Sequence, residues 1–164
     1  MIEASTANCL EVSEGRVMDC SNSFFSIKIG DEAEIDHVVT QEDVDKFIEL
    51  TGDNNKIHLD KGYTAQTKLA KPIVHGMLTA SFISTLIGTK LPGHGALWYE
   101  QHTRFLKPLY VGERIRVWGK VIKKQLALKL LVLEIVIYGD HNRKIVECKA
   151  KVVSVFPENI KEGV

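Results

Sequence analysis

The stretch Ile73-Val-His-Gly-Met-Leu-Thr-Ala-Ser-Phe-Ile-Ser-Thr-Leu-Ile-Gly88 contains no charged side chain, and its apolar and small residues fall on every face of the helix that it predicts. A helix with this pattern is buried on all sides rather than lying on a surface. Because the chain has only 164 residues, the elements around this helix must wrap it.

The segments after the helix predict the strands that wrap it. Glu113–Lys124 alternates between apolar and polar residues, and Leu126–Tyr138 is rich in Leu, Val and Ile. Gly139–Asn142 has the composition of a turn, and Lys144–Phe156 again places apolar residues on one face. With a further strand over Gly95–Phe105, we expect one buried central helix and about five antiparallel strands curling round it. The fold class is α+β.

Two extended segments and a short helix are predicted before the central helix. Phe24–Ile29 reads as a short strand, and Ala33–Val39 is extended. Lys61–Lys71 predicts a shorter helical segment, which Pro72 ends.

A second amphipathic helix leads directly to a polar loop. Thr40 and Asp43 have the spacing of a capping box, and the residues from about Gln41 to Leu50 place an apolar face at helical period. Gly52 is a natural terminator for this helix. Asp53 therefore follows directly on a helix end, where neighbouring residues determine the backbone geometry.

Composition narrows the function classes. Hydrophobic residues make up 45% of the chain and charged residues 26%, as in ordinary globular proteins. Lys plus Arg and Asp plus Glu both number 21, so the basic excess of a general nucleic-acid binder is absent. Three cysteines without Cys-x-x-Cys spacing suit a reducing compartment.

No apolar run approaches the length of a membrane span, and the first 25 residues have neither the apolar block of a secretory signal nor the Arg-rich, acid-poor character of a transit peptide. We therefore expect a cytoplasmic protein without membrane association, with the mitochondrial matrix as the alternative for a eukaryotic source. Met1–Asn22 predicts a loosely ordered extension, and residues 23–164 a single domain.

Asp53 and His58 are the first candidates for chemistry. A carboxylate and an imidazole five residues apart on one loop can converge on a single water molecule, remove a proton from it and deliver one elsewhere. The alternative is that Asp53 caps the next turn while His58 is a surface histidine or a hydrogen-bonded core histidine.

The start of the buried helix is the second candidate. The first N–H groups of a helix have no intrahelical partner, and Gly76 would let a substrate carbonyl come close to its N–H. Alternatively, Gly76 only permits tight packing. His75 is interpreted as a packed, structural residue. One hydroxyl inside the helix could orient Asp53, but spacing does not choose among Thr79, Ser81, Ser84 and Thr85.

Other chemistries find less support. No two of the candidate histidines stand three or four residues apart, so no helical metal-ligand pair is predicted, and no Gly-x-Ser-x-Gly elbow exists for a serine nucleophile. The scattered basic residues from Arg104 to Lys129 could hold a phosphate-bearing carrier, but such a pattern is more typical of a solvated strand face.

Three blocks in order carry a resemblance to a known family. They are Phe47–Asp60, which contains Thr51-Gly-Asp-Asn-Asn-Lys-Ile-His58, then Pro72–Met77, and Arg104–Pro108 with Val111–Glu113. Together they resemble the MaoC-like family, and more narrowly its (R)-specific enoyl-CoA hydratases and type 2 3-hydroxyacyl-thioester dehydratases. The resemblance runs from about Gly30 to Val155.

The resemblance implies a hot-dog fold, in which a curved antiparallel sheet wraps a long helix, usually in a homodimer. It implies (R)-specific hydration of trans-2-enoyl-CoA, or the reverse dehydration, in fatty acid metabolism. Asp53 and His58 would be the catalytic pair, and the N–H of Gly76 would hold the thioester carbonyl. Ser84 would support the aspartate, and Asn55 would organise the loop.

On this resemblance no redox cofactor or metal is required, since CoA or the phosphopantetheine of an acyl carrier protein is part of the substrate. No nucleic-acid or membrane partner is implied. The chain departs from the family at Lys56, where a proline usually follows the motif asparagine. A proline would stiffen the loop, so Lys56 leaves the substrate open.

Three alternatives stay open. The chain could dehydrate 3-hydroxyacyl groups on acyl carrier protein, or hydrolyse thioesters on the same fold. It could instead bind acyl thioesters without turnover, for which Lys56 and the N-terminal extension are the only support in the sequence.

Overall fold

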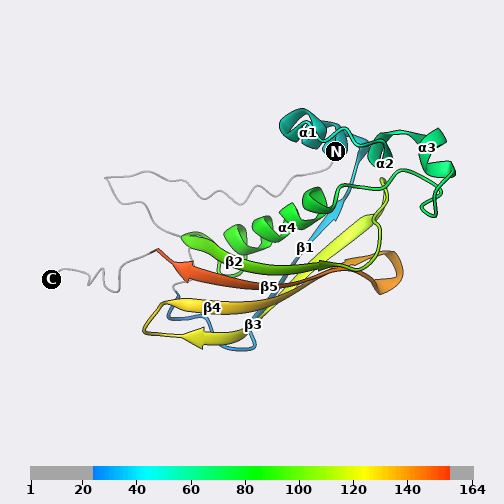
Figure 1. The fold of residues 1–164 in the computed structure, drawn as a ribbon. Coiled ribbons are helices and arrows are strands. Elements are labelled where there is room, and N and C mark those ends of the chain that lie inside the picture. Colours follow the sequence, from blue (N-terminus) through cyan, green and yellow to red (C-terminus); the bar gives the residue numbers. More distant parts are fainter. Residues whose placement is uncertain (1–23, 156–164) are drawn as a thin grey trace, which may run out of the picture.

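The computed structural model describes residues 24–155, which form a five-stranded antiparallel sheet with one long helix across one of its faces (Figure 1). The predicted extension Met1–Asn22 lies outside these residues. The elements in chain order are β1 (Glu32–Val38), α1 (Gln41–Thr51), α2 (Lys56–Leu59), α3 (Lys61–Ala65), α4 (Gly76–Thr89), β2 (Ala96–Phe105), β3 (Arg114–Gln125), β4 (Leu130–Gly139), a 3₁₀ turn (Asp140–Asn142) and β5 (Arg143–Ser154).

The strand order across the sheet is β1-β3-β4-β5-β2, so β1 and β2 are the edge strands. All four strand pairs are antiparallel. Figure 1 shows α1, α2 and α3 gathered at one end of the sheet, above the start of α4. The predicted α+β class with five antiparallel strands is confirmed. Within residues 24–155, no helix combines the length and apolar character needed to cross a membrane.

The core lies between α4 and the sheet. Leu78, Ile83, Leu86 and Ile87 of α4 are buried, and they pack with alternate residues of the central strands. These strand residues are Ile115, Val117, Val121, Leu131, Leu133, Ile135, Ile137, Val146, Cys148, Ala150 and Val152. The predicted alternation of β3 and β5 is thus confirmed.

The prediction that the central helix is buried on every face is wrong for this chain. Met77 is 58% exposed, and Ser81, Ser84 and Thr85 are exposed as well. One sheet covers only one side of a helix. The other side of α4 carries small polar residues, which lack the charges that usually mark a solvent-facing stripe.

The predicted capping box and glycine terminator of α1 are confirmed. The Thr40 hydroxyl accepts the Asp43 N–H at 3.2 Å, and the Asp43 carboxylate accepts the Thr40 N–H at 2.8 Å. Partial burial raises the pKa of Asp43, but hydrogen bonds from the Thr40 backbone and from the His37 and Thr40 side chains outweigh it, so the pKa lies below its ordinary value. Gly52 ends the helix with φ of 73°.

The strand predicted over Phe24–Ile29 is wrong, because this segment forms turns. Its carbonyl groups converge on one cation instead of pairing with a strand. The Lys124 ammonium donates to the carbonyls of Phe24, Phe25 and Ile27 at 2.9, 3.1 and 2.6 Å. Phe24 and Ile27 are buried, so the apolar pattern reflected core packing rather than a strand.

Two further boundaries differ from the predictions. Only Lys61–Ala65 of the predicted segment Lys61–Lys71 is helical, and Ala70, with φ of 62°, has a left-handed backbone that no α-helix continues through. β4 begins at Leu130 rather than Leu126, because residues 126–129 form a turn with Lys129 at φ of 47°.

Candidate active site

Asp53 stands in a loop that its own side chains hold in shape. It follows the left-handed Gly52, and its N–H donates to the Thr51 hydroxyl at 3.3 Å. One Asp53 carboxylate oxygen accepts the Asn55 N–H, also at 3.3 Å, and the Asn55 side-chain oxygen accepts the Ile57 N–H at the start of α2. Asn55 is thus placed as a helix cap that shapes the loop. The Asp53 side chain remains 52% exposed.

His58 lies on the short helix α2, which sequence periodicity did not predict. Its Nδ1 lies 2.7 Å from the carbonyl oxygen of Ile73. Because a carbonyl only accepts hydrogen bonds, Nδ1 must carry the proton, and Nε2 of the neutral ring keeps a free lone pair. The Ile73 N–H donates in turn to the Ile57 carbonyl at 3.1 Å. This pairing brings the segment before α4 alongside α2.

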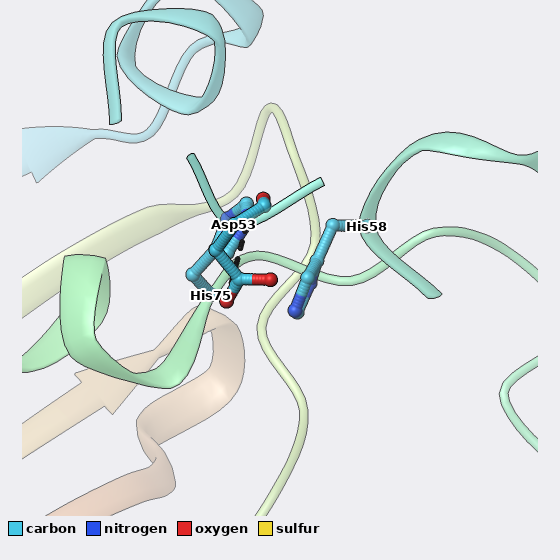
Figure 2. Close-up of side chains that lie close together, drawn as sticks. All are labelled: Asp53, His58 and His75. Carbon is cyan, nitrogen blue, oxygen red and sulfur yellow. Dashed lines mark hydrogen bonds and ion pairs between the residues drawn. The ribbon is translucent and has the colours of Figure 1, made fainter. Parts of the chain in front are cut away.

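His75 joins the pair from the N-terminal end of α4 (Figure 2). Its ring is 2% exposed and stacks on the His58 ring with centroids 3.7 Å apart. His75 Nε2 lies 3.0 Å from the Asp53 carbonyl oxygen and 4.0 Å from an Asp53 carboxylate oxygen. Sequence reasoning treated His75 as packed, and the structure buries it, but at the site itself. The sequence feature that could have indicated a place for His75 at the site is its position directly before Gly76.

The start of α4 faces the same space. His75 is the N-cap of α4 and provides no side-chain cap, so the first N–H groups of the helix have no intrahelical partner. Gly76 and Met77 both line the cavity that holds Asp53 and His58. A Cβ at Gly76 would stand 3.2 Å from the Phe105 ring, so glycine also makes room for that ring.

The cavity has a volume of about 650 Å³, within the usual range for small-molecule sites. Asp53, His58 and His75 provide its polar groups together with Thr51, Ser81 and Gln101. Its other walls are mostly apolar and come from Phe47, Met77, Ala80, Trp98 and Phe105.

The structure does not bring Ser84 to Asp53 within this chain. Ser84 is exposed on α4, eight residues beyond Gly76, or about 12 Å along the helix axis. No hydrogen bond joins Ser84 and Asp53 among residues 24–155. Of the four candidate hydroxyls, only Ser81 lines the cavity, and it donates to the Leu78 carbonyl at 2.7 Å.

Asp53, His58 and His75 also form a set of possible metal ligands, with ligand atoms within 4.8 Å of one another. Histidine spacing along a single helix does not predict this set, because its members come from three segments. To bind an ion through Nε2, His75 would have to give up its hydrogen bond to the Asp53 carbonyl. As they stand, the groups suit proton transfer: a carboxylate and a free imidazole nitrogen face one cavity beside unpaired N–H groups.

Comparison with known proteins finds similar hydratases and dehydratases. An (R)-specific enoyl-CoA hydratase from Aeromonas caviae is 38% identical over 90 residues, covering 55% of this chain and 67% of the relative. A 3-hydroxybutyryl-CoA dehydratase from Methylorubrum extorquens is 36% identical over 94 residues, covering 57% and 60%. The chain thus spans about three fifths to two thirds of the length of these curated relatives.

Two solved structures share the fold. The (R)-hydratase from A. caviae involved in PHA biosynthesis aligns with a TM-score of 0.76 and 31% identity, covering 79% of this chain and 98% of that one. An R-hydratase from Pseudomonas aeruginosa aligns with a TM-score of 0.75 and 28% identity, covering 80% and 84%. The expected hot-dog fold is confirmed. A family model described as "MaoC like domain" matches residues 26–151, and the chain therefore belongs to the MaoC-like family.

Proposed function

We propose that the protein adds water across the 2,3 double bond of a trans-2-enoyl-CoA to give the (R)-3-hydroxyacyl-CoA, and catalyses the reverse dehydration. The observation that carries the proposal is the convergence of the Asp53 carboxylate and His58 Nε2 on a cavity beside the N–H of Gly76. The names of the similar proteins supply the substrate class and the stereochemistry.

The thioester carbonyl would accept the Gly76 N–H at the positive end of α4. A helix N-terminus stabilises negative charge on oxygen, so electron density moves from the double bond toward the carbonyl and C3 becomes electrophilic. A methyl side chain at Gly76 would crowd this approach, because the Phe105 ring already occupies the adjacent space.

Asp53 and His58 would hold the water that attacks C3. One proton passes from the water to this pair as the oxygen bonds to C3, and one proton passes from the pair to C2. The pair ends in the charge state in which it began, and the product has gained H and OH. His75 would keep both groups in place through its contacts with the Asp53 carbonyl and the His58 ring.

The reaction consumes only water, so we propose that no redox cofactor or metal takes part. We also infer a homodimer. β2 is an edge strand, and its Leu97 and Tyr99 are 55% and 64% exposed. An edge strand with exposed apolar side chains is suited to pairing with a second copy.

The test is loss of the absorbance of the conjugated enoyl group when the purified full chain meets crotonyl-, octenoyl- and dodecenoyl-CoA. The 3-hydroxyacyl product should be of the (R) form, and parallel assays on acyl-carrier-protein thioesters identify the carrier. Asp53→Asn and His58→Ala should remove the activity. No turnover of any enoyl thioester would refute the proposal. In that case, release of free thiol would indicate a thioesterase, and binding alone would indicate a non-catalytic module.

A further inference from the structure

A second cavity lies next to the catalytic one and shares two lining residues with it. Its volume is about 330 Å³, half that of the first, and Gly76 and Phe105 line both cavities. Most of its other walls are apolar and come from Leu69, Ile73, Val74, Leu106, Leu109 and Ile145. A thioester held at Gly76 would therefore stand at the boundary between two apolar spaces.

Phe105 forms that boundary. Three of its ring carbons lie 3.2 to 3.4 Å from the point where a Cβ of Gly76 would be. Phe105 is the last residue of the edge strand β2, and it is 51% exposed. The next residue leaves the ladder but stays attached to the sheet, because the Leu106 N–H donates to the Ile145 carbonyl at 2.8 Å. The backbone is thus held at the residue whose side chain lines both cavities.

We propose that Phe105 determines which acyl groups are accepted, by confining the acyl chain to the first cavity and closing off the second. Once the ring is removed, the second cavity becomes an additional acyl compartment, suited to the alkyl tail of a longer thioester. The residues that line the second cavity are suited to binding an alkyl tail. Lys107 is the one charged residue among those that line it, and the Thr79 hydroxyl is already bonded to the His75 carbonyl at 3.1 Å. This inference rests on the proposed function, since it requires a thioester at Gly76.

The experiment compares Phe105→Ala with Leu106→Ala and with the double variant. Leu106 lines the second cavity and not the first, so Leu106→Ala enlarges the second space without removing Phe105. For each protein, kcat/KM is measured with crotonyl-CoA and dodecenoyl-CoA. We expect Phe105→Ala to raise the dodecenoyl-to-crotonyl ratio by about tenfold or more, about tenfold being the low end of what one methylene contact in an apolar pocket contributes. Leu106→Ala alone should leave the ratio unchanged, and the double variant should raise it beyond Phe105→Ala.

Each other outcome counts against the inference. An equal fall for both substrates in Phe105→Ala would show that the ring only supports the site. A raised ratio in Leu106→Ala alone would show that the second cavity is already open. If Phe105→Ala does not fold, as judged by circular dichroism, Phe105→Leu decides with a smaller shift in the same direction. Failure of the proposed function looks different, because the unaltered protein would then turn over neither thioester.

Discussion

The substitution Gly76→Ala changes a residue that lies against the Phe105 ring and that, in the proposed mechanism, binds the thioester carbonyl. The added methyl would stand 3.2 Å from one Phe105 ring carbon and 3.4 Å from two others, so the ring must move by a few tenths of an ångström. Overpacking in a closed core costs about 1–3 kcal/mol. Here the ring is half exposed, and alanine in place of glycine in a helix stabilises by up to about 1 kcal/mol.

The two effects nearly cancel, so we expect the free energy of unfolding to change by less than about 1 kcal/mol and Tm by less than about 4 °C. Activity should respond far more. The methyl would occupy the approach of the thioester carbonyl to the Gly76 N–H. Loss of one such donor lowers kcat about 100-fold or more, and we expect kcat/KM for crotonyl-CoA to fall by about that factor.

Thermal unfolding and the decrease in enoyl absorbance measure the two quantities on the same preparation. Adding Phe105→Leu to Gly76→Ala should not restore kcat/KM, because the smaller side chain relieves the contact with the ring but the methyl remains. Wild-type kcat/KM in Gly76→Ala would falsify the placement of the carbonyl at Gly76. A fall in Tm of 10 °C or more, far beyond the few degrees expected, would show that the Phe105 ring cannot move to make room for the methyl.

Three further predictions concern the proposed catalytic pair, the cap of α1 and the core. Asp53→Asn and His58→Gln should each lower kcat by about 100-fold or more. Asp53→Asn should leave Tm within a few degrees, since the Asp53 side chain is half exposed, whereas His58→Gln also removes the ring that stacks on His75 and should lower Tm further. A nearly unchanged kcat would remove the acid–base assignment. Asp43, with its lowered pKa, should stabilise the fold above about pH 4 and lose that contribution as the pH falls through its folded-state pKa. The difference in urea stability between Asp43→Asn and the parent should therefore be largest at pH 7 and shrink steadily as the pH is lowered below about 4. Gly119→Ala would place a methyl 2.7 Å from Leu86 Cδ2 and should cost about 1–3 kcal/mol; an unchanged Tm would show that α4 can shift on the sheet.

Periodicity predicted the parts of the fold that local rules determine. Thr40, Asp43 and Gly52 bound α1 as expected because a capping box and a left-handed glycine act within one or two turns. The strands β3 and β5 were recognisable because alternate residues face the core. The strand predicted over Phe24–Ile29 is wrong for the opposite reason. The geometry of this segment depends on Lys124, about 100 residues away in the sequence.

The site shows the same division between local and tertiary information. Asp53 follows a helix end and Gly76 begins a helix, so both could be proposed from spacing. The burial of His75 was predicted, but its contacts with Asp53 and His58 were not, because α2 reaches that position through the backbone bond between Ile73 and Ile57. No hydrophobic periodicity along the chain predicts the backbone pairing of Ile73 with Ile57.

For Ser84, in contrast, the family resemblance predicts a contact with Asp53 that the single chain does not make. Ser84 lies about 12 Å along α4 from Gly76, on the side that the sheet leaves exposed, and within residues 24–155 no hydrogen bond joins it to Asp53. If the supporting role is correct, the aspartate must belong to a second copy, and β2 with its exposed Leu97 and Tyr99 offers the edge for such a pairing. Ser84→Ala should then lower kcat in the dimer, whereas disrupting β2 with Tyr99→Lys should lower it together with the measured mass in solution. A monomer with full activity would exclude Ser84 from the site.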